Sequence, residues 1–388
     1  MSAKATAPKL AVGTEAGPQS KFVAMRADMN AGLIERDDEI DLALTALISN
    51  HNPLFVGDPG TAKSMLGRAL ADWLDGRQYE VLLSKFTDPA ELFGPVSIEG
   101  LKKDEYRRIT DNTILDAKIA FVDEVFKGST AILNTLLGVF NERRYRNGKA
   151  WINCPLVMAI AASNEWPQDG ETGGKELGAL FDRFLYRKVV KPIRSPEGEE
   201  RLLWDATLGV TATTRITPDE IGLARREAMA LDYTDDAKEG FVEILRQLEE
   251  QGVMPGDRRK RWTVEAVKAY AYLDGAKAVG KDHLEIMAHT CWVVPTADQI
   301  DKTAQVVAAV ANPLGMKINE LLAGAREAYK SAGNGRDMKT AIPASAKIKE
   351  VLEKLAPLAK TSTKADSVLK HVNGLNVKLR TAMLAKMG

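Results

Sequence analysis

An eight-residue stretch early in the chain has the residue types that hold a nucleoside triphosphate. It reads Gly57-Asp58-Pro59-Gly60-Thr61-Ala62-Lys63-Ser64. Glycines let backbone N–H groups turn towards phosphate oxygens, the lysine places a positive charge beside the β- and γ-phosphates, and the serine hydroxyl can hold Mg²⁺. Ala62 replaces the last glycine of G-x-x-x-x-G-K-[ST], which a helix start tolerates if its φ is negative. We predict a phosphate loop here, with Leu33 and Ile34 as further nucleotide-binding residues.

Two adjacent carboxylates end a short apolar run farther along the chain. Asp123 and Glu124 directly follow the run Ile119–Val122. A parallel strand delivers its last residues to the sheet edge that also carries a phosphate loop. There Asp123 can hold Mg²⁺ through water, and Glu124 can orient and polarise the attacking water. Acidic residues at a strand end often only enter solvent, but their spacing from the phosphate loop favours a catalytic role.

A polar residue follows another apolar run in the same way. The run Leu156–Ala162 leads through a serine into Asn164. At the tip of a strand beside the two carboxylates, Asn164 can hold the attacking water or touch the γ-phosphate. The alternative is that this asparagine merely begins a loop.

Several arginines are candidates for contacts with the phosphates. Arg183 has apolar neighbours, so it either pairs with an internal aspartate or projects to a neighbouring subunit's nucleotide, and Arg187 is the alternative. Arg258, Arg259 and Arg261 lie at the start of a late helix, from which one of them could reach the nucleotide. Each of them could equally be a surface charge.

The hydrophobic pattern predicts the elements that position these residues. Residues 21–52 have helical spacing, and four short apolar runs predict buried parallel strands. These runs are Leu54–Val56, Glu80–Leu83, Ile119–Val122 and Leu156–Ala162. Helical patterns between them indicate an α/β sheet covered on both faces. Because only helical patterns follow Pro192, we expect an α/β core over 21–192 and an all-helical lid over 193–296.

The remaining segments complete the predicted domain organisation. Residues 1–20 are rich in Ala, Gly and Pro and lack an apolar signal core, which predicts a disordered leader. Residues 297–332 are predicted as a helical extension that can break at Pro313. A Gly- and Asn-bearing linker over 333–344 then precedes a hairpin of two amphipathic helices over 345–388.

The composition excludes some classes of protein. Apolar residues make up 45% and charged residues 27% of a chain with no net charge, which is typical of a globular protein and not of an electrostatic binder of nucleic acid or membranes. The two cysteines, Cys154 and Cys291, cannot form a disulfide framework and are expected to be buried. They fit a reducing cytoplasm. No run of 18 apolar residues predicts a membrane span.

The end of the chain is basic and has an apolar stripe. From Arg336 to Lys386 there are 11 Lys/Arg and 4 Asp/Glu residues, a local net charge of +7. A solvated helix face explains this charge most simply, and a docking surface for an acidic partner or nucleic acid is the alternative. No aromatic residue interleaves the charges, so base stacking has no support. The rest of the chain, a neighbouring subunit or a partner must cover the apolar stripe, and we expect a partner or a neighbouring subunit to do so.

Several stretches, in order along the chain, match one known family. They are the phosphate loop with alanine before Lys-Ser, Glu91–Ile98, Phe121–Val125, Ala131–Leu137, Asn141–Gly148, Ala161–Glu165, Asp182-Arg183 and Gly256–Arg259. Over about residues 28–295 the chain resembles the MoxR family of AAA+ ATPases, most closely its RavA branch. That branch continues into a β-containing domain set in a helical arm, whereas the pattern after residue 300 here is helical throughout.

The resemblance implies a homohexameric ring with ATP and Mg²⁺ between subunits. The roles it implies are phosphate and Mg²⁺ binding for Lys63 and Ser64, metal and water carboxylates for Asp123 and Glu124, sensor one for Asn164, a trans finger for Arg183, and sensor two for Arg258 or Arg259. Residues 94–110 correspond to the family's insert near the pore. The resemblance also implies chaperone-like work on a protein client, often with a von Willebrand factor A domain partner.

Two other functions stay open at this stage. A DNA-remodelling AAA+ ATPase would need a basic pore or an appended nucleic-acid domain, and the basic tail alone supports it. A nucleotide-controlled scaffold with little turnover conflicts with the intact set of Lys63, Glu124 and Arg183. We therefore predict an ATP-hydrolysing motor that remodels protein clients, without a nucleic-acid partner.

Overall fold

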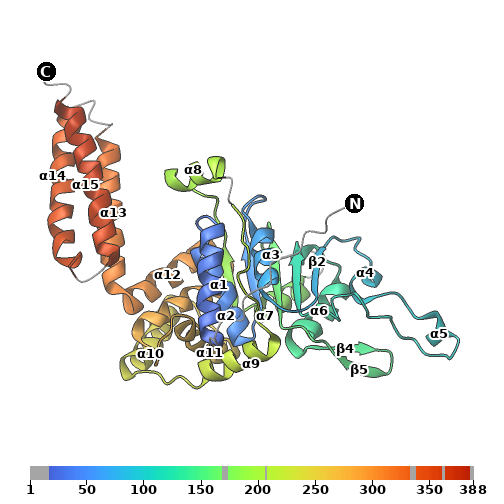
Figure 1. The fold of residues 1–388 in the computed structure, drawn as a ribbon. Helices are drawn as coiled ribbons and strands as arrows, with labels where there is room; N and C mark the ends of the chain where they lie inside the picture. The colour runs from blue at the N-terminus through green and yellow to red at the C-terminus, as the bar shows by residue number, and fades with distance from the viewer. Residues whose placement is uncertain (1–16, 168–173, 206–207, 333–337, 361–362, 385–388) are drawn as a thin grey trace. The chain divides into compact units, whose positions relative to one another are not determined.

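The computed structural model describes residues 17–167, 174–205, 208–332, 338–360 and 363–384 (Figure 1). The chain divides into two compact units, Met1–Ala304 and Gln305–Gly388. The first unit contains the sheet and all the residues predicted to do chemistry. In the described part of the second unit, every secondary-structure element is a helix.

A five-stranded parallel sheet forms the centre of the first unit (Figure 1). Its strands, in spatial order, are β2 (Gln78–Leu82), β3 (Ile119–Asp123), β6 (Met158–Ser163), β1 (Pro53–Val56) and β7 (Tyr186–Val189). The four strands expected from apolar runs are confirmed within two residues at each end. The edge strand β7 was missed, because its four residues include Arg187 and Lys188 and form no apolar run.

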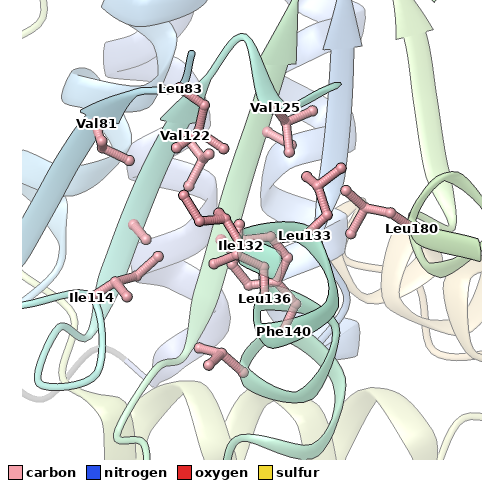
Figure 2. Close-up of a cluster of buried hydrophobic side chains, with 14 of the residues drawn as sticks. Val81, Leu83, Ile114, Val122, Val125, Ile132, Leu133, Leu136, Phe140 and Leu180 are labelled. Atoms are coloured by element: carbon pink, nitrogen blue, oxygen red, sulfur yellow. The ribbon is translucent and has the colours of Figure 1, made fainter. Parts of the chain in front are cut away.

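Helices cover both faces of this sheet, as the alternating pattern predicts. The helical segments before β7 are α1 (Pro18–Gly32), α2 (Asp37–Ser49), α3 (Lys63–Trp73), α4 (Pro89–Phe93), α5 (Ile98–Leu101), the 3-10 turn η1 (Val125–Lys127), α6 (Thr130–Glu142) and α7 (Gly174–Arg183). Of these, α2, α3, η1 and α6 pack directly on the strands. Figure 2 shows Ile132, Leu133 and Leu136 of α6 packed with Val122 of β3 in a buried cluster. Strand side chains alternate between faces, so Phe121 points to the opposite side. There it lies against Gly67 of α3, where an added Cβ would be 2.4 Å from the ring.

The segment expected to be an insert projects from the core beside a β-hairpin that sequence analysis missed. The hairpin consists of β4 (Arg144–Asn147) and β5 (Ala150–Asn153). Asn147 accepts a hydrogen bond from the backbone N–H of Arg108 at 2.7 Å, which ties residues 94–110 to this hairpin. Ile98 and Leu101 of α5 are largely exposed.

Helices follow β7 to the end of the first unit, as expected. They are α8 (Pro196–Trp204), α9 (Pro218–Met229), α10 (Asp235–Glu250), α11 (Asp257–Leu273), the 3-10 segment η2 (Lys281–His289) and α12 (Ala297–Ala311), which extends past Ala304. A capping box of Thr217 and Glu220 begins α9, and both α9 and α11 pack against α2.

The second unit corrects two expectations about the end of the chain. Its helices are α13 (Pro313–Ser331), α14 (Met338–Leu358) and α15 (Thr363–Leu384). The expected linker over 333–344 is helical from Met338 onward, with Pro343 inside α14, and residues 333–337 lie outside the described part. The expected two-helix hairpin is part of a three-helix bundle.

The bundle also changes the expectation for the apolar stripe. Ile348 and Leu355 of α14 and Val372 and Leu379 of α15 form a buried cluster with Ile318 of α13. The stripe is therefore covered by the chain itself, because α13 supplies a third apolar face. The prediction that a partner or neighbouring subunit covers it is wrong.

Two smaller expectations concern cysteines and membranes. Cys154 and Cys291 are free and buried, as expected, and burial raises the pKa of each thiol to about 11. Among the helices described, none combines the length and apolar character that a membrane crossing requires.

Candidate functional site

The phosphate loop connects β1 to α3 at the edge of the sheet where its strands end, here called the carboxyl edge. Gly57 lies so close to the chain after β7 that an added Cβ would be 2.3 Å from the carbonyl oxygen of Val190. Gly60 has a φ of +80°. Ala62 has a φ of +65°, so the condition that its φ be negative is not met. The loop needs a left-handed residue directly before α3, and alanine holds that conformation at a cost.

The lysine of the loop is buried and fully engaged. Lys63 is 7% exposed, and its Nζ donates to the carbonyl oxygens of Gly57 at 2.6 Å and Asp58 at 2.9 Å. It also donates to Oδ1 of Asn164 at 3.1 Å. Burial lowers the pKa of Lys63, while the nearby carboxylates of Asp123 and Glu124 oppose that shift. The ammonium group therefore lies among acceptors that a triphosphate could replace.

The register of β3 and β6 brings the acidic pair to the predicted asparagine. Val122 pairs with Ala161, so Glu124 and Asn164 lie together just beyond the two strands. The Asn164 side-chain amide donates to Oε1 of Glu124, and its backbone N–H donates to Oε2 at 3.4 Å. Glu124 has a φ of +52° and is 7% exposed. A strained backbone thus holds this carboxylate beside the predicted sensor.

A pocket of about 620 Å³ lies at the carboxyl edge. Its lining includes the loop residues from Pro59 to Ser64 together with Asp123 and Asn164, and Leu33 and Ile34 line it as well. Ser64 and Asp123 are the residues predicted to hold Mg²⁺. A hydroxyl and a carboxylate in one pocket fit Mg²⁺, which keeps several waters and takes few protein ligands beside a nucleotide.

Sequence analysis missed several residues at this pocket. Ile193 and Leu202 add apolar lining from the chain after β7, where no motif indicates them. Arg36 is 5% exposed, and its Nε donates a hydrogen bond of 3.2 Å to the carbonyl oxygen of Thr61. This contact helps to hold the phosphate loop in place. These residues come from separate segments, so no local pattern could have grouped them.

A second and larger cavity of about 870 Å³ lies beside β7. It shares Arg36 and Pro192 with the first pocket but contains no residue of the phosphate loop. Size alone would favour this cavity. The smaller pocket is the candidate site, because it contains the loop, Asp123 and Asn164.

Two of the candidate arginines are structural. Arg187 is 1% exposed, and its guanidinium donates to the carbonyl oxygens of Phe181, Phe184 and Trp292, each at 2.9 Å. Arg259 is 3% exposed and donates to the carbonyl oxygens of Asp182 and Thr290. Burial lowers the pKa of both arginines. The alternatives that placed Arg187 as the trans finger and Arg259 as sensor two are therefore wrong.

Of the three remaining candidates, none lines the pocket of its own chain, and Arg261 is exposed on α11. Arg183 is the last residue of α7, just before β7, whose first residue pairs with Pro53 at the start of β1. Arg258 is exposed, and its guanidinium carbon lies 5.7 Å from the centroid of the Trp262 ring. The centroid of that ring lies 5.0 Å from the centroid of the ring of His51, which is two residues before β1. Arg183 and Arg258 are therefore near the edge where strands begin, here called the amino edge. The structure separates them from the phosphate loop.

Known proteins match both the sequence and the fold. A family model described as the MoxR domain in the MoxR-vWA-beta-propeller ternary systems matches residues 20–223. Two uncharacterized proteins of Methanocaldococcus jannaschii, MJ0812 and MJ0079, are each 38% identical, over 74% and 70% of this chain and 75% and 70% of their own lengths. The chain belongs to the MoxR family.

More distant matches cover part of the sequence or the fold. The structural protein ORF618 of Acidianus two-tailed virus is 32% identical over 45% of this chain and 28% of its own length. A solved structure of a proposed ATPase from Cytophaga hutchinsonii superposes with a TM-score of 0.60. It is 15% identical and covers 76% of this chain and 94% of its own, so it shows the fold alone. The MoxR-family chain thus has an AAA+ α/β core.

Proposed function

We propose that this MoxR-family chain binds ATP with Mg²⁺ and hydrolyses it to remodel or activate a protein client. One observation carries the proposal. The phosphate-loop lysine, two strand-end carboxylates and an asparagine meet at one edge of the sheet, linked from Lys63 through Asn164 to Glu124. This arrangement suits phosphoryl transfer to water.

The residues divide the work of hydrolysis. Lys63 would exchange the carbonyl oxygens of Gly57 and Asp58 for the β- and γ-phosphates. Ser64 and Asp123 would hold Mg²⁺, whose positive charge would stabilise the negative charge that develops on the phosphate oxygens. Glu124 would accept the proton of the attacking water, and Asn164 would keep that carboxylate and the water in line.

A ring would bring to each pocket the arginines that the pocket's own chain places elsewhere. Arg183 and Arg258 lie towards the amino edge, away from the phosphate loop, so either one would act on the nucleotide of a neighbouring copy. An arginine in trans contributes about 10³–10⁵ in rate in other nucleotide hydrolases. We therefore propose a homohexameric ring with Arg183 as the finger and Arg258 as sensor two.

The proposed partner is a von Willebrand factor A domain protein. The family model that matches this chain is described from MoxR-vWA-beta-propeller systems, which supports that partner class over DNA. The basic charge of residues 336–386 is the feature that would favour a DNA-remodelling ATPase. The linked site argues against a scaffold without turnover. Membership of the RavA branch and chaperone-like action stay predictions.

Two substitutions test binding and chemistry separately. Lys63→Ala should weaken ATP binding about 100-fold, since it removes a charge-assisted contact to the phosphates. Glu124→Gln should bind ATP with Mg²⁺ within a few-fold of the parent while turnover falls at least about 100-fold. Titration with a fluorescent ATP analogue and a phosphate-release assay measure the two quantities. Lys85→Ala, an exposed lysine outside the pocket, is the control. Parent-like turnover in Glu124→Gln would contradict the assignment.

A further inference from the structure

One charged residue beside the proposed hydrolysis site, Lys127, lies outside the motifs that predicted the site. Lys127 ends the 3-10 turn η1, which begins directly after Glu124. The backbone N–H of Lys127 donates to the carbonyl oxygen of Glu124 at 2.8 Å. This tight turn folds the lysine back over the carboxylate three residues before it.

The lysine contacts the proposed catalytic carboxylate on one oxygen. Its Nζ lies 3.2 Å from Oε2 of Glu124, whose side chain is 9% exposed. Oε1 of the same carboxylate accepts from the Asn164 side-chain amide. Oε2 also accepts a long hydrogen bond of 3.4 Å from the backbone N–H of Asn164, so Lys127 adds the shorter, charged contact to the oxygen that Asn164 holds less closely.

A second carboxylate shares the lysine more loosely. Oε1 of Glu165 lies 3.8 Å from Nζ of Lys127, and its side chain is 52% exposed. A screened, solvent-exposed pair at that distance contributes little. The contact with buried Glu124 is therefore the one that can matter for chemistry.

We propose that Lys127 is a positioning residue for hydrolysis. It holds the carboxylate of Glu124, together with Asn164, in the orientation that accepts the proton of the attacking water. Lys127 is not among the residues that line the pocket, so it should act on the chemical step and not on ATP binding. Misplacing a catalytic group by about 1 Å can cost about 10²-fold in rate. The inference rests on the proposed function, in which Glu124 is the catalytic carboxylate.

The experiment removes the charge and then restores it. In Lys127→Met, turnover at saturating ATP should fall about tenfold or more, while the dissociation constant for ATP with Mg²⁺ stays within about twofold. Lys127→Arg keeps a donor at this position and should recover most of the turnover. Glu165→Gln removes the other carboxylate near Lys127 and is the matched control, with turnover expected within about threefold of the parent.

A double variant distinguishes positioning from a general structural effect. In the Glu124→Gln background, single-turnover hydrolysis should show no further loss when Lys127→Met is added, because the lysine acts through the residue already replaced. Parent-like or faster turnover in Lys127→Met, a parallel loss of ATP affinity, or an additive loss in the double variant would each overturn the inference. If the parent binds ATP without hydrolysing it, or Glu124→Gln hydrolyses ATP like the parent, the proposed function itself fails.

Discussion

The two edges of the central sheet both carry charged residues, but they use them differently. At the carboxyl edge, Lys63, Asn164 and Glu124 contact one another through side chains beside an open pocket. At the amino edge, Arg187 and Arg259 bury their guanidinium groups against backbone carbonyl oxygens.

The comparison shows what separates a chemical role from a structural one. Charged groups that face a pocket and bind other side chains can exchange partners with a ligand. Buried arginines that bind main-chain carbonyls hold segments of the chain together, because losing them leaves several acceptors unpaired. Residue type alone does not distinguish the two roles, since Arg183 and Arg187 lie four positions apart.

The largest expected effect comes from pairing the carboxyl edge of one subunit with the amino edge of its neighbour. Arg183→Ala and Glu124→Gln should each abolish most turnover, the first by losing the finger and the second by losing the base. Mixing the two inactive proteins should restore measurable turnover, because some interfaces pair an intact Glu124 with an intact Arg183. Phosphate release from the mixture measures it.

That experiment has a built-in control. Mixing each variant with itself must give no recovery, and co-assembly of the two must be shown by size-exclusion chromatography of tagged copies. Co-assembled mixtures without recovery would contradict a trans role for Arg183.

A smaller but distinct effect is expected within the amino edge. Arg187→Met should lower the free energy of unfolding of the first unit by about 2–4 kcal/mol, because carbonyl oxygens of Phe181, Phe184 and Trp292 lose their donor. Arg258→Ala should cost no more than about 1 kcal/mol, since it loses only an exposed contact over Trp262. Urea denaturation followed by tryptophan fluorescence compares them. Equal losses would mean that burial does not separate these arginines.

The smallest expected effect lies in the phosphate loop. Ala62→Gly should raise the free energy of unfolding by roughly 0.5–1 kcal/mol, because glycine adopts a φ of +65° without the strain of a Cβ. Ala69→Gly, within α3 at ordinary helical geometry, is the matched control and should destabilise by about 1 kcal/mol. The same denaturation assay measures both. Destabilisation by Ala62→Gly would show that the left-handed backbone here carries no strain.

Much of the carboxyl edge could be predicted because its signals are local. The phosphate loop, the acidic pair and Asn164 each follow an apolar run that forms a strand. Because parallel strands run in the same direction, their carboxyl ends lie at one edge of the sheet. The C-terminal unit shows the opposite case. The apolar stripe on α14 and α15 and a helix after Pro313 were both expected from the sequence, but spacing could not show that this helix, α13, covers the stripe.

The sequence by itself determined four of the strands of the central sheet and the polar residues that follow them, because the hydrophobic pattern reports local backbone geometry. Only the tertiary structure decided the left-handed φ of Ala62, the burial of Arg187 and Arg259, and the contact of Lys127 with Glu124. It also revealed β7, whose burial comes from neighbours and not from apolar residues of its own. The burial of the two arginines and the pairing of β7 depend on which distant segment lies alongside. The φ of Ala62 and the Lys127–Glu124 contact depend on the backbone geometry of a loop and a turn. Neither composition nor spacing contains that information.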